Sequence, residues 1–392
     1  MRSMSDYQVI LGVLVIIYLS ECVWWIRRGS VVFRRTLAHR WVMAHPSHGF
    51  GSTGAGMAFL NPMVLNSTFV AHEWPLSITA AGIHAFVPQV INGSDRPEWQ
   101  LHYVAFSDIY TIDRDGASLR INGCPFVRLN SPALTAHFEA LLWRLHHLPQ
   151  EQRDAAIRDA VRRALDCRRI RRRHLRYEQT VWPLQITSYA LSFMLFGPLP
   201  LSLGFLQFRE WLLPTLGAIL LSLIVSVVWF CRAHRILYPR CRTSRWRGAL
   251  MMLLAATHAI RAGDVLSRDL LTGFHPLAVA LALCRPEEAQ HIARAILLDV
   301  NHPMEPRYPS DDQTERQTID AFHQVLQAAI YACVTAAGGD PARWMEPPAR
   351  EDLSCQSYCP RCDRQYVITQ GTCESCGGIP LVPFTAQAAS AS

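Results

Sequence analysis

The sequence predicts an α+β multi-domain membrane protein with three transmembrane helices, a β-meander closed by a helix, a helical region and a small cysteine-rich C-terminal domain. Three observations carry this prediction. Half of the 392 residues are hydrophobic and 18% are charged, which is less charge than soluble globular proteins usually carry. Arginines border three long apolar runs. Five of the twelve cysteines lie in the last 38 residues, which favours a local metal site over a disulfide framework.

The first apolar run covers residues 9–26 and follows an extracytoplasmic stub at 1–8. Its eighteen residues would extend about 27 Å as a helix, just enough to cross the hydrocarbon core. Arg27 and Arg28 follow the run and no Ala-x-Ala site does, which favours a retained anchor over a cleaved signal peptide. Glu21 has no partner in sequence, so we expect it to snorkel or face another helix and not to relay protons.

The second and third runs, residues 182–205 and 211–231, are separated by five residues and predict a tight antiparallel hairpin. Trp182, Trp211 and Trp229 lie near the ends, where amphipathic rings prefer to sit. Pro198 and Pro200 should kink or break the second helix.

The distribution of arginine predicts the orientation. The arginines concentrate after the first run, before the second and after the third, whereas the N-terminal stub and the hairpin tip hold only Arg2 and Arg209. The positive-inside rule then places the N-terminus outside, and residues 27–181 and 232–392 in the cytosol, in a multi-pass protein of the cell inner membrane. The net charge of +7 comes entirely from arginine, which a GC-rich genome explains without a binding function.

Residues 27–75 predict an irregular cytosolic segment, because they show no sustained period. The run from Gly49 to Gly54 matches the dinucleotide-binding fingerprint by letter. The fingerprint requires a strand before it and a long helix after it, whereas Pro46 and His48 precede this run and Pro62 limits any helix that follows, so a loop is favoured.

Residues 76–148 predict short strands followed by one helix. Asp115-Gly116 and Asn122-Gly123 are hairpin turns, and Ser131-Pro132 begins a helix with an apolar stripe. This pattern resembles the pleckstrin-homology-like architecture, which implies a module for lipid, peptide or self-association and no catalysis. A small α+β domain of another kind remains open.

Residues 149–181 predict a basic juxtamembrane helix, with eight arginines between 162 and 176. This run is primarily a topology signal. Contact with anionic headgroups would follow from it, at about 1 kcal/mol per charge. The arginines we expect there are Arg168, Arg169, Arg171, Arg172 and Arg173. Nucleic acid is disfavoured, because no aromatic platform is interleaved with the charges.

Residues 232–337 predict a cytosolic helical region, with one helix beginning at Pro286 and another, capped by Asp311 or Asp312, ending at Gly338-Gly339. Four histidines in it lack the paired spacing of metal ligands: His258, His275, His291 and His323. Residues 338–354 predict a linker, and residues 385–392 a disordered tail.

Two Cys-x-x-Cys pairs in residues 355–384 resemble the zinc-ribbon, or rubredoxin-like, family. Ten residues separate the pair Cys359 and Cys362 from the pair Cys373 and Cys376. The resemblance implies structural Zn²⁺ held by these four thiolates, with no coordination position left for a substrate. Iron remains an alternative, and a reducing cytosol argues against disulfides. Asp363 stands where the family has glycine, and Cys355 is a spare.

The features together favour a membrane scaffold or adaptor with unidentified protein partners, and not an enzyme. A membrane enzyme or transporter would have to use ionisable side chains that show no family spacing: Glu21, Asp108, His45, His48, His72 and His102. A zinc-ribbon nucleic-acid or regulatory binder is the third hypothesis. No binding site for an organic cofactor is predicted.

Overall fold

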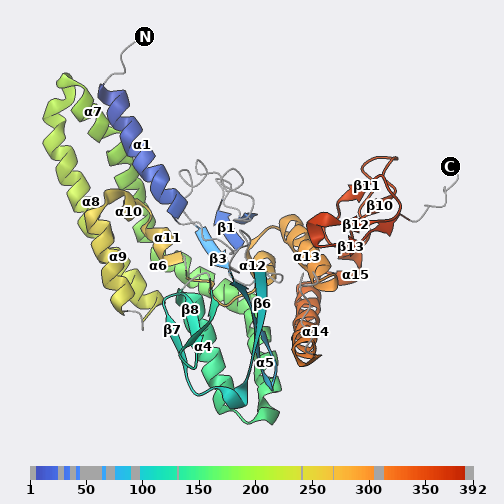
Figure 1. The fold of residues 1–392 in the computed structure, drawn as a ribbon. Coiled ribbons are helices and arrows are strands. Elements are labelled where there is room, and N and C mark those ends of the chain that lie inside the picture. Colours follow the sequence, from blue (N-terminus) through green and yellow to red (C-terminus); the bar gives the residue numbers. More distant parts are fainter. Residues whose placement is uncertain are drawn as a thin grey trace. The chain divides into compact units, whose positions relative to one another are not determined.

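The computed structural model describes residues 6–24, 31–35, 41–44, 64–67, 76–89, 98–129, 132–239, 242–267, 269–303 and 313–384. It is a mixed α+β chain of helices and small sheets (Figure 1). The chain divides into two compact units. Unit 1 comprises Met1–Ser67 and Arg168–Thr272, and unit 2 comprises Thr68–Cys167 and Gly273–Ser392. Several predicted features lie outside the described residues: the Gly49–Gly54 run, His45, His48, His72, Ser131, Asp311, Asp312 and the tail.

The helices of unit 1 are built around an apolar hairpin. They are α1 (Asp6–Trp24), α6 (Cys167–Phe196), α7 (Pro198–Gly204), α8 (Leu212–Leu237), α9 (Arg242–Leu254), α10 (Ala256–Ile260) and α11 (Ala262–Ser267). The short 3₁₀ helix η3 (Leu206–Trp211) connects α7 to α8. Two stretches, Cys167–Gly204 and Phe208–Leu237, are long and apolar enough to cross a membrane, while Asp6–Tyr18 is a shorter apolar stretch.

Proline shapes the first arm of the hairpin, as the sequence predicts. α6 ends at Phe196 and α7 begins at Pro198, with Gly197 between them in a non-helical conformation. Proline lacks an N–H and its ring clashes with the preceding turn, so the helix breaks there. Pro183 lies inside α6, which continues past it.

The segment predicted to be irregular, 27–75, contains a small sheet. Strands β1 (Val31–Arg35), β2 (Trp41–Ala44) and β3 (Val64–Ser67) pair antiparallel in the order β2-β1-β3. Phe33 is fully buried and stands opposite Met43 and Leu65. These strands were missed because each has only four or five residues, too few for a clear alternating pattern.

The strands between Leu76 and Arg128 in unit 2 form two antiparallel three-stranded sheets, and α4 (Pro132–His147) follows them. The first sheet holds β4 (Leu76–Ile78), β5 (Gly82–Gln89) and β6 (Glu98–Ala105), and the second holds β7 (Ile112–Asp115), β8 (Ser118–Ile121) and β9 (Cys124–Arg128). Both predicted turns are present, with Gly116, Asn122 and Gly123 at positive φ. α4 packs Phe138, Leu142 and Leu145 into the core.

The remaining helices of unit 2 are α5 (Gln150–Ala164), α12 (Pro276–Leu283), α13 (Pro286–Asn301), α14 (Gln313–Ala336) and α15 (Pro341–Trp344). α14 packs against β4, β5 and α5. The predicted helical region 232–337 is therefore divided, because α9 to α11 belong to unit 1 and α12 to α14 to unit 2. The predicted linker contains α15, whose first turn is capped by Asp340 accepting from the backbone N–H of Ala342.

Candidate metal centre

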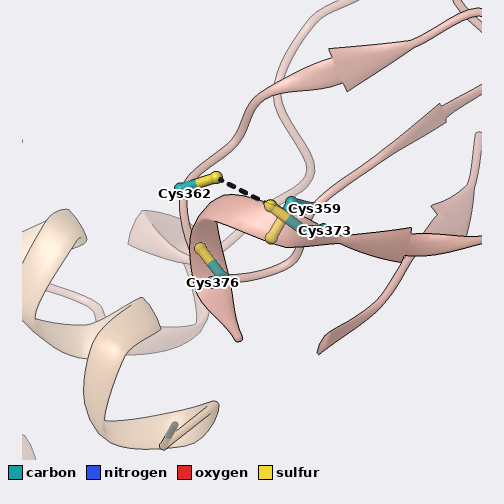
Figure 2. Close-up of side chains that lie close together, drawn as sticks. All are labelled: Cys359, Cys362, Cys373 and Cys376. Atoms are coloured by element: carbon teal, nitrogen blue, oxygen red, sulfur yellow. Dashed lines mark hydrogen bonds between the residues drawn. The ribbon is translucent and has the colours of Figure 1, made fainter. Parts of the chain in front are cut away.

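The four predicted ligand cysteines lie together. All their sulfur atoms are within 4.8 Å of one another, and the sulfurs of Cys362 and Cys373 are 3.8 Å apart (Figure 2). Four thiolates at 2.3 Å from a tetrahedral zinc ion would be about 3.8 Å from one another. Cys359, Cys373 and Cys376 are buried, whereas Cys362 is exposed. The geometry fits a metal ion held by four thiolates.

Short strands bring the two cysteine pairs together. The order β11-β10-β14 joins β10 (Ser357–Tyr358), β11 (Gln365–Tyr366) and β14 (Val382–Pro383). A second small sheet joins β12 (Thr372–Cys373) to β13 (Ile379–Pro380). Cys359 therefore follows β10, and Cys373 ends β12. Tyr366, Ile379 and Leu381 pack around the three buried cysteines, Cys359, Cys373 and Cys376.

Both Cys-x-x-Cys turns are closed by backbone hydrogen bonds. In the first turn, the N–H of Asp363 donates to the carbonyl oxygen of Cys359 at 3.0 Å. In the second turn, the N–H of Gly378 donates to the carbonyl oxygen of Cys373 at 3.0 Å. Gly377 and Gly378 have φ of 72° and 93°, and Asp363 has φ of 58°. Aspartate is among the few residues that enter this left-handed region readily, so the departure from glycine leaves the turn intact.

The cluster also perturbs its own acidity. Burial raises the pKa of Cys373, but hydrogen bonds from the Tyr366 hydroxyl, at 3.1 Å, and from the other thiols outweigh burial and lower it to about 7. Burial raises the pKa of Cys362 and Cys376. The pKa of Tyr366 rises to about 12, chiefly because its hydroxyl donates to Cys373. A bound cation would displace the protons of these thiols.

Two ion pairs, missed by the sequence analysis, join the first cysteine turn to α13. Arg294 makes a bidentate contact with Asp363, at 2.8 and 2.9 Å, and donates a third bond to the carbonyl of Trp344 at 2.6 Å. Arg361 pairs with Asp299, with Nε 2.8 Å from the carboxylate. We call these four charged residues the knuckle clamp. The partners are 62 and 69 residues apart, so no local pattern indicates the pairing; the aspartate in place of glycine was the only signal.

The other candidate residues do not join the cluster. Cys355 lies outside the group of four. His275 caps α12 through Nδ1, which accepts from the N–H of Leu277 at 3.2 Å, and His323 lies 2.6 Å from the carbonyl of Val300. Asp108 is exposed and accepts from the hydroxyl of Ser107 at 2.9 Å. Within the described residues, no second group of three or more metal-ligating side chains occurs.

The predicted headgroup arginines lie in the first two turns of α6. Four of them are exposed, namely Arg168, Arg169, Arg171 and Arg172, whereas Arg173 is partly buried. Glu21 and His102 lie in α1 and β6, and the structure does not describe their side chains.

Comparison with known proteins gave no match to this chain among protein-family models, curated proteins or solved structures.

Proposed function

We propose that this chain is a membrane-anchored scaffold or adaptor that presents interaction modules and a structural zinc ribbon on one side of a bilayer. The four-cysteine cluster carries the proposal, because four protein ligands fill a tetrahedral ion and leave no position for a substrate. Such a site supplies folding energy and a rigid surface. The knuckle clamp supports this role, since it couples the metal site to a helix of the same unit.

The metal we propose is zinc, held by Cys359, Cys362, Cys373 and Cys376. Metal analysis of the full chain purified in detergent tests this assignment. We expect one zinc per chain, loss of zinc in Cys373→Ser and retention in Cys355→Ser, which removes a cysteine outside the cluster. Iron in place of zinc would contradict the metal identity, and a metal-free chain that is still folded would remove the site.

The membrane anchor we propose has three spans, with α1 as the first. Nineteen residues of α1 extend about 28 Å, enough for the hydrocarbon core. α1 packs along the first arm of the hairpin: the rings of Tyr7 and Phe205 are 5.6 Å apart, and so are those of Tyr18 and Phe196. A lone signal sequence would have no such packing partner along its length. The exposed apolar side chains of α6 and α8 then face lipid.

The interaction module we propose is the pair of sheets β4 to β9 with α4, in the manner of the pleckstrin-homology-like architecture. The order of two antiparallel meanders followed by one amphipathic helix supports this proposal. The exposed arginines of α6 would add contacts with anionic headgroups.

The adaptor role is tested by capture of partners from detergent extracts. Wild-type, Cys373→Ser and Cys355→Ser chains are compared at equal loading. We expect partners that depend on the ribbon to be lost with Cys373→Ser and kept with Cys355→Ser. Identical partner sets in all three would contradict the ribbon as a docking element, and strongly salt-dependent DNA binding by the wild type would favour the nucleic-acid hypothesis.

A further inference from the structure

The helix α9, which follows the hairpin, exposes one apolar face. Trp246, Leu250, Leu253 and Leu254 recur at helical spacing, with 60%, 57%, 54% and 73% of their surfaces exposed. Ala249 and Met252 lie on the other side and are buried. Contiguous exposed apolar surface of this kind marks a site of interaction with a protein or a membrane.

The buried side of α9 lies against α8. A Cβ atom on Gly248 would come within 2.6 Å of the ring of Phe230, so the two helices approach closely at this point. α9 runs back alongside the C-terminal half of α8 (Figure 1). From Gly248 to Leu254 a helix rises about 9 Å, which brings Leu254 towards the middle of α8.

The sequence of this segment suits the interior of a bilayer. No aspartate, glutamate or arginine occurs from residue 248 to 260, whereas Arg245 and Arg247 flank Trp246 immediately before it. Thirteen residues are too few to span a membrane, but they suit a segment that enters and returns on the same side. α10 makes the return and contacts α1 and α8.

Backbone hydrogen bonds hold the turn, and the two charged residues that follow it form an ion pair within the protein, which suits a segment at membrane depth. The N–H of Ala255 donates to the carbonyl oxygen of Met251 at 3.1 Å, and the N–H of His258 donates to the carbonyl oxygen of Ala255 at 3.0 Å. Arg261 and Asp264 pair at 2.6 Å and are fully buried. The Tyr238 hydroxyl donates to the carbonyl of Leu266 at 2.5 Å, which ties α11 to the end of α8.

We propose that α9 and α10 form a re-entrant segment whose exposed face is covered by lipid acyl chains, alongside the C-terminal half of α8. The acyl chain is the occupant because α9 packs against α8, whose exposed apolar side chains face lipid in the proposed anchor, among them Leu221, Ile224 and Val228. The inference rests on the proposed insertion of α6 and α8. Because the segment leaves on the side where it enters, it does not alter the sidedness of residues 232–392.

The test places a photoreactive benzoylphenylalanine at single leucines of the full chain in vesicles of phosphatidylcholine and phosphatidylglycerol. Leu254, which is 73% exposed, reports on α9, and Leu220, which is 59% exposed, reports on α8. Leu353 lies outside the hairpin and is 91% exposed, so it serves as the control. After irradiation, mass spectrometry measures lipid adducts. We expect adducts at Leu254 and Leu220 at least about tenfold above those at Leu353.

Adducts at Leu220 without adducts at Leu254 would overturn the re-entrant segment and keep the membrane hairpin. Their absence at both positions would overturn both proposals. A chain-to-chain crosslink at Leu254 without lipid adducts would assign this face to a second copy of the chain, which also overturns the inference.

Discussion

Asp363 supports the cysteine cluster in two separate ways, through its backbone and through its side chain. Its φ of 58° lets the first cysteine turn close, and its carboxylate binds Arg294. Glycine would satisfy the first requirement better than aspartate does, but it would leave Arg294 without this partner. The contact with the neighbouring helix therefore explains why an aspartate stands at this position of the turn.

Substitution of Asp363 can separate the two contributions. Asp363→Gly should destabilise unit 2 by about 1–3 kcal/mol, because it removes charged hydrogen bonds while the turn relaxes. Asp363→Ala should cost about 1–2 kcal/mol more, since alanine is strained in the left-handed region. Denaturant unfolding of the zinc-loaded chain in detergent measures both. Equal losses in the two variants would contradict a backbone role for this residue.

His275 predicts a dependence of stability on pH. Burial lowers its pKa to about 3, from an ordinary value near 6.5, and its Nδ1 accepts a hydrogen bond as the cap of α12. The unfolded chain binds a proton at this histidine below pH about 6.5, whereas the folded chain does not. Its contribution is therefore complete above that pH and is lost as the pH falls towards 3, by up to about 1.4 kcal/mol per pH unit.

The matched variant for this effect is His275→Asn, because asparagine also caps helices but does not titrate. Acid also removes thiolate-bound metals, so the quantity to measure is the difference in unfolding free energy between variant and wild type. We expect the variant to become more stable relative to the wild type as the pH falls from 6.5 to 4.5. A difference that stays constant with pH would show that His275 is not the sensitive group.

Among the elements, α13 is the one to which the metal site is tied. It contributes Arg294 and Asp299, and the cysteine turn contributes Arg361 and Asp363, so each side supplies one charge of each sign. Such reciprocal pairing fixes the orientation of the turn on the helix. It also implies that whatever orders the turn, including a metal, helps to order α13 and α15.

Removal of the proposed metal should therefore destabilise helices outside the cysteine cluster. We expect chelation of the full chain to increase amide hydrogen exchange at the C-terminal half of α13 and in α15 by at least about tenfold, while α4 stays unchanged as the internal control. Increased exchange confined to residues 355–384 would mean that the knuckle clamp does not transmit the state of the metal site.

A charge exchange tests the knuckle clamp itself. Arg361→Asp and Asp299→Arg should each accelerate loss of zinc to a chelator, because each leaves two like charges in a partly buried contact. The double variant restores opposite charges and should recover a substantial part of the loss. Additive effects of the two substitutions would contradict a direct interaction.

Elements differ in how far the sequence could predict them. The hairpin turns at Asn122-Gly123 and Asp115-Gly116, the helix break at Pro198 and the two cysteine pairs depend on local rules, and the structure contains all of them. The knuckle clamp and the packing of α9 on α8 depend on contacts between separate helices and turns. The strands β1 to β3 are too short for a periodic signal.

At the scale of the whole molecule, the number of spans decides the sidedness of the chain. The structure contains two helical stretches that are long and apolar enough to cross a membrane, and α1 is the proposed third span. With three spans the two termini lie on opposite sides, and with two they lie on the same side. The arginines that flank the three apolar runs favour three.

Reporter tags at the two termini distinguish these topologies. A tag before Asp6 should be cleaved by protease added to spheroplasts, whereas a tag after residue 384 should be protected until the membrane is permeabilised. Protection of both tags would mean that only the two arms of the hairpin cross the membrane and that α1 packs beside them without crossing it. Cleavage of the C-terminal tag would place the four cysteines in an oxidising compartment, where disulfides would compete with zinc. Cleavage of the N-terminal tag and protection of the C-terminal tag are expected, because the proposed zinc site needs a reducing compartment and the arginines that flank the proposed spans favour the same side.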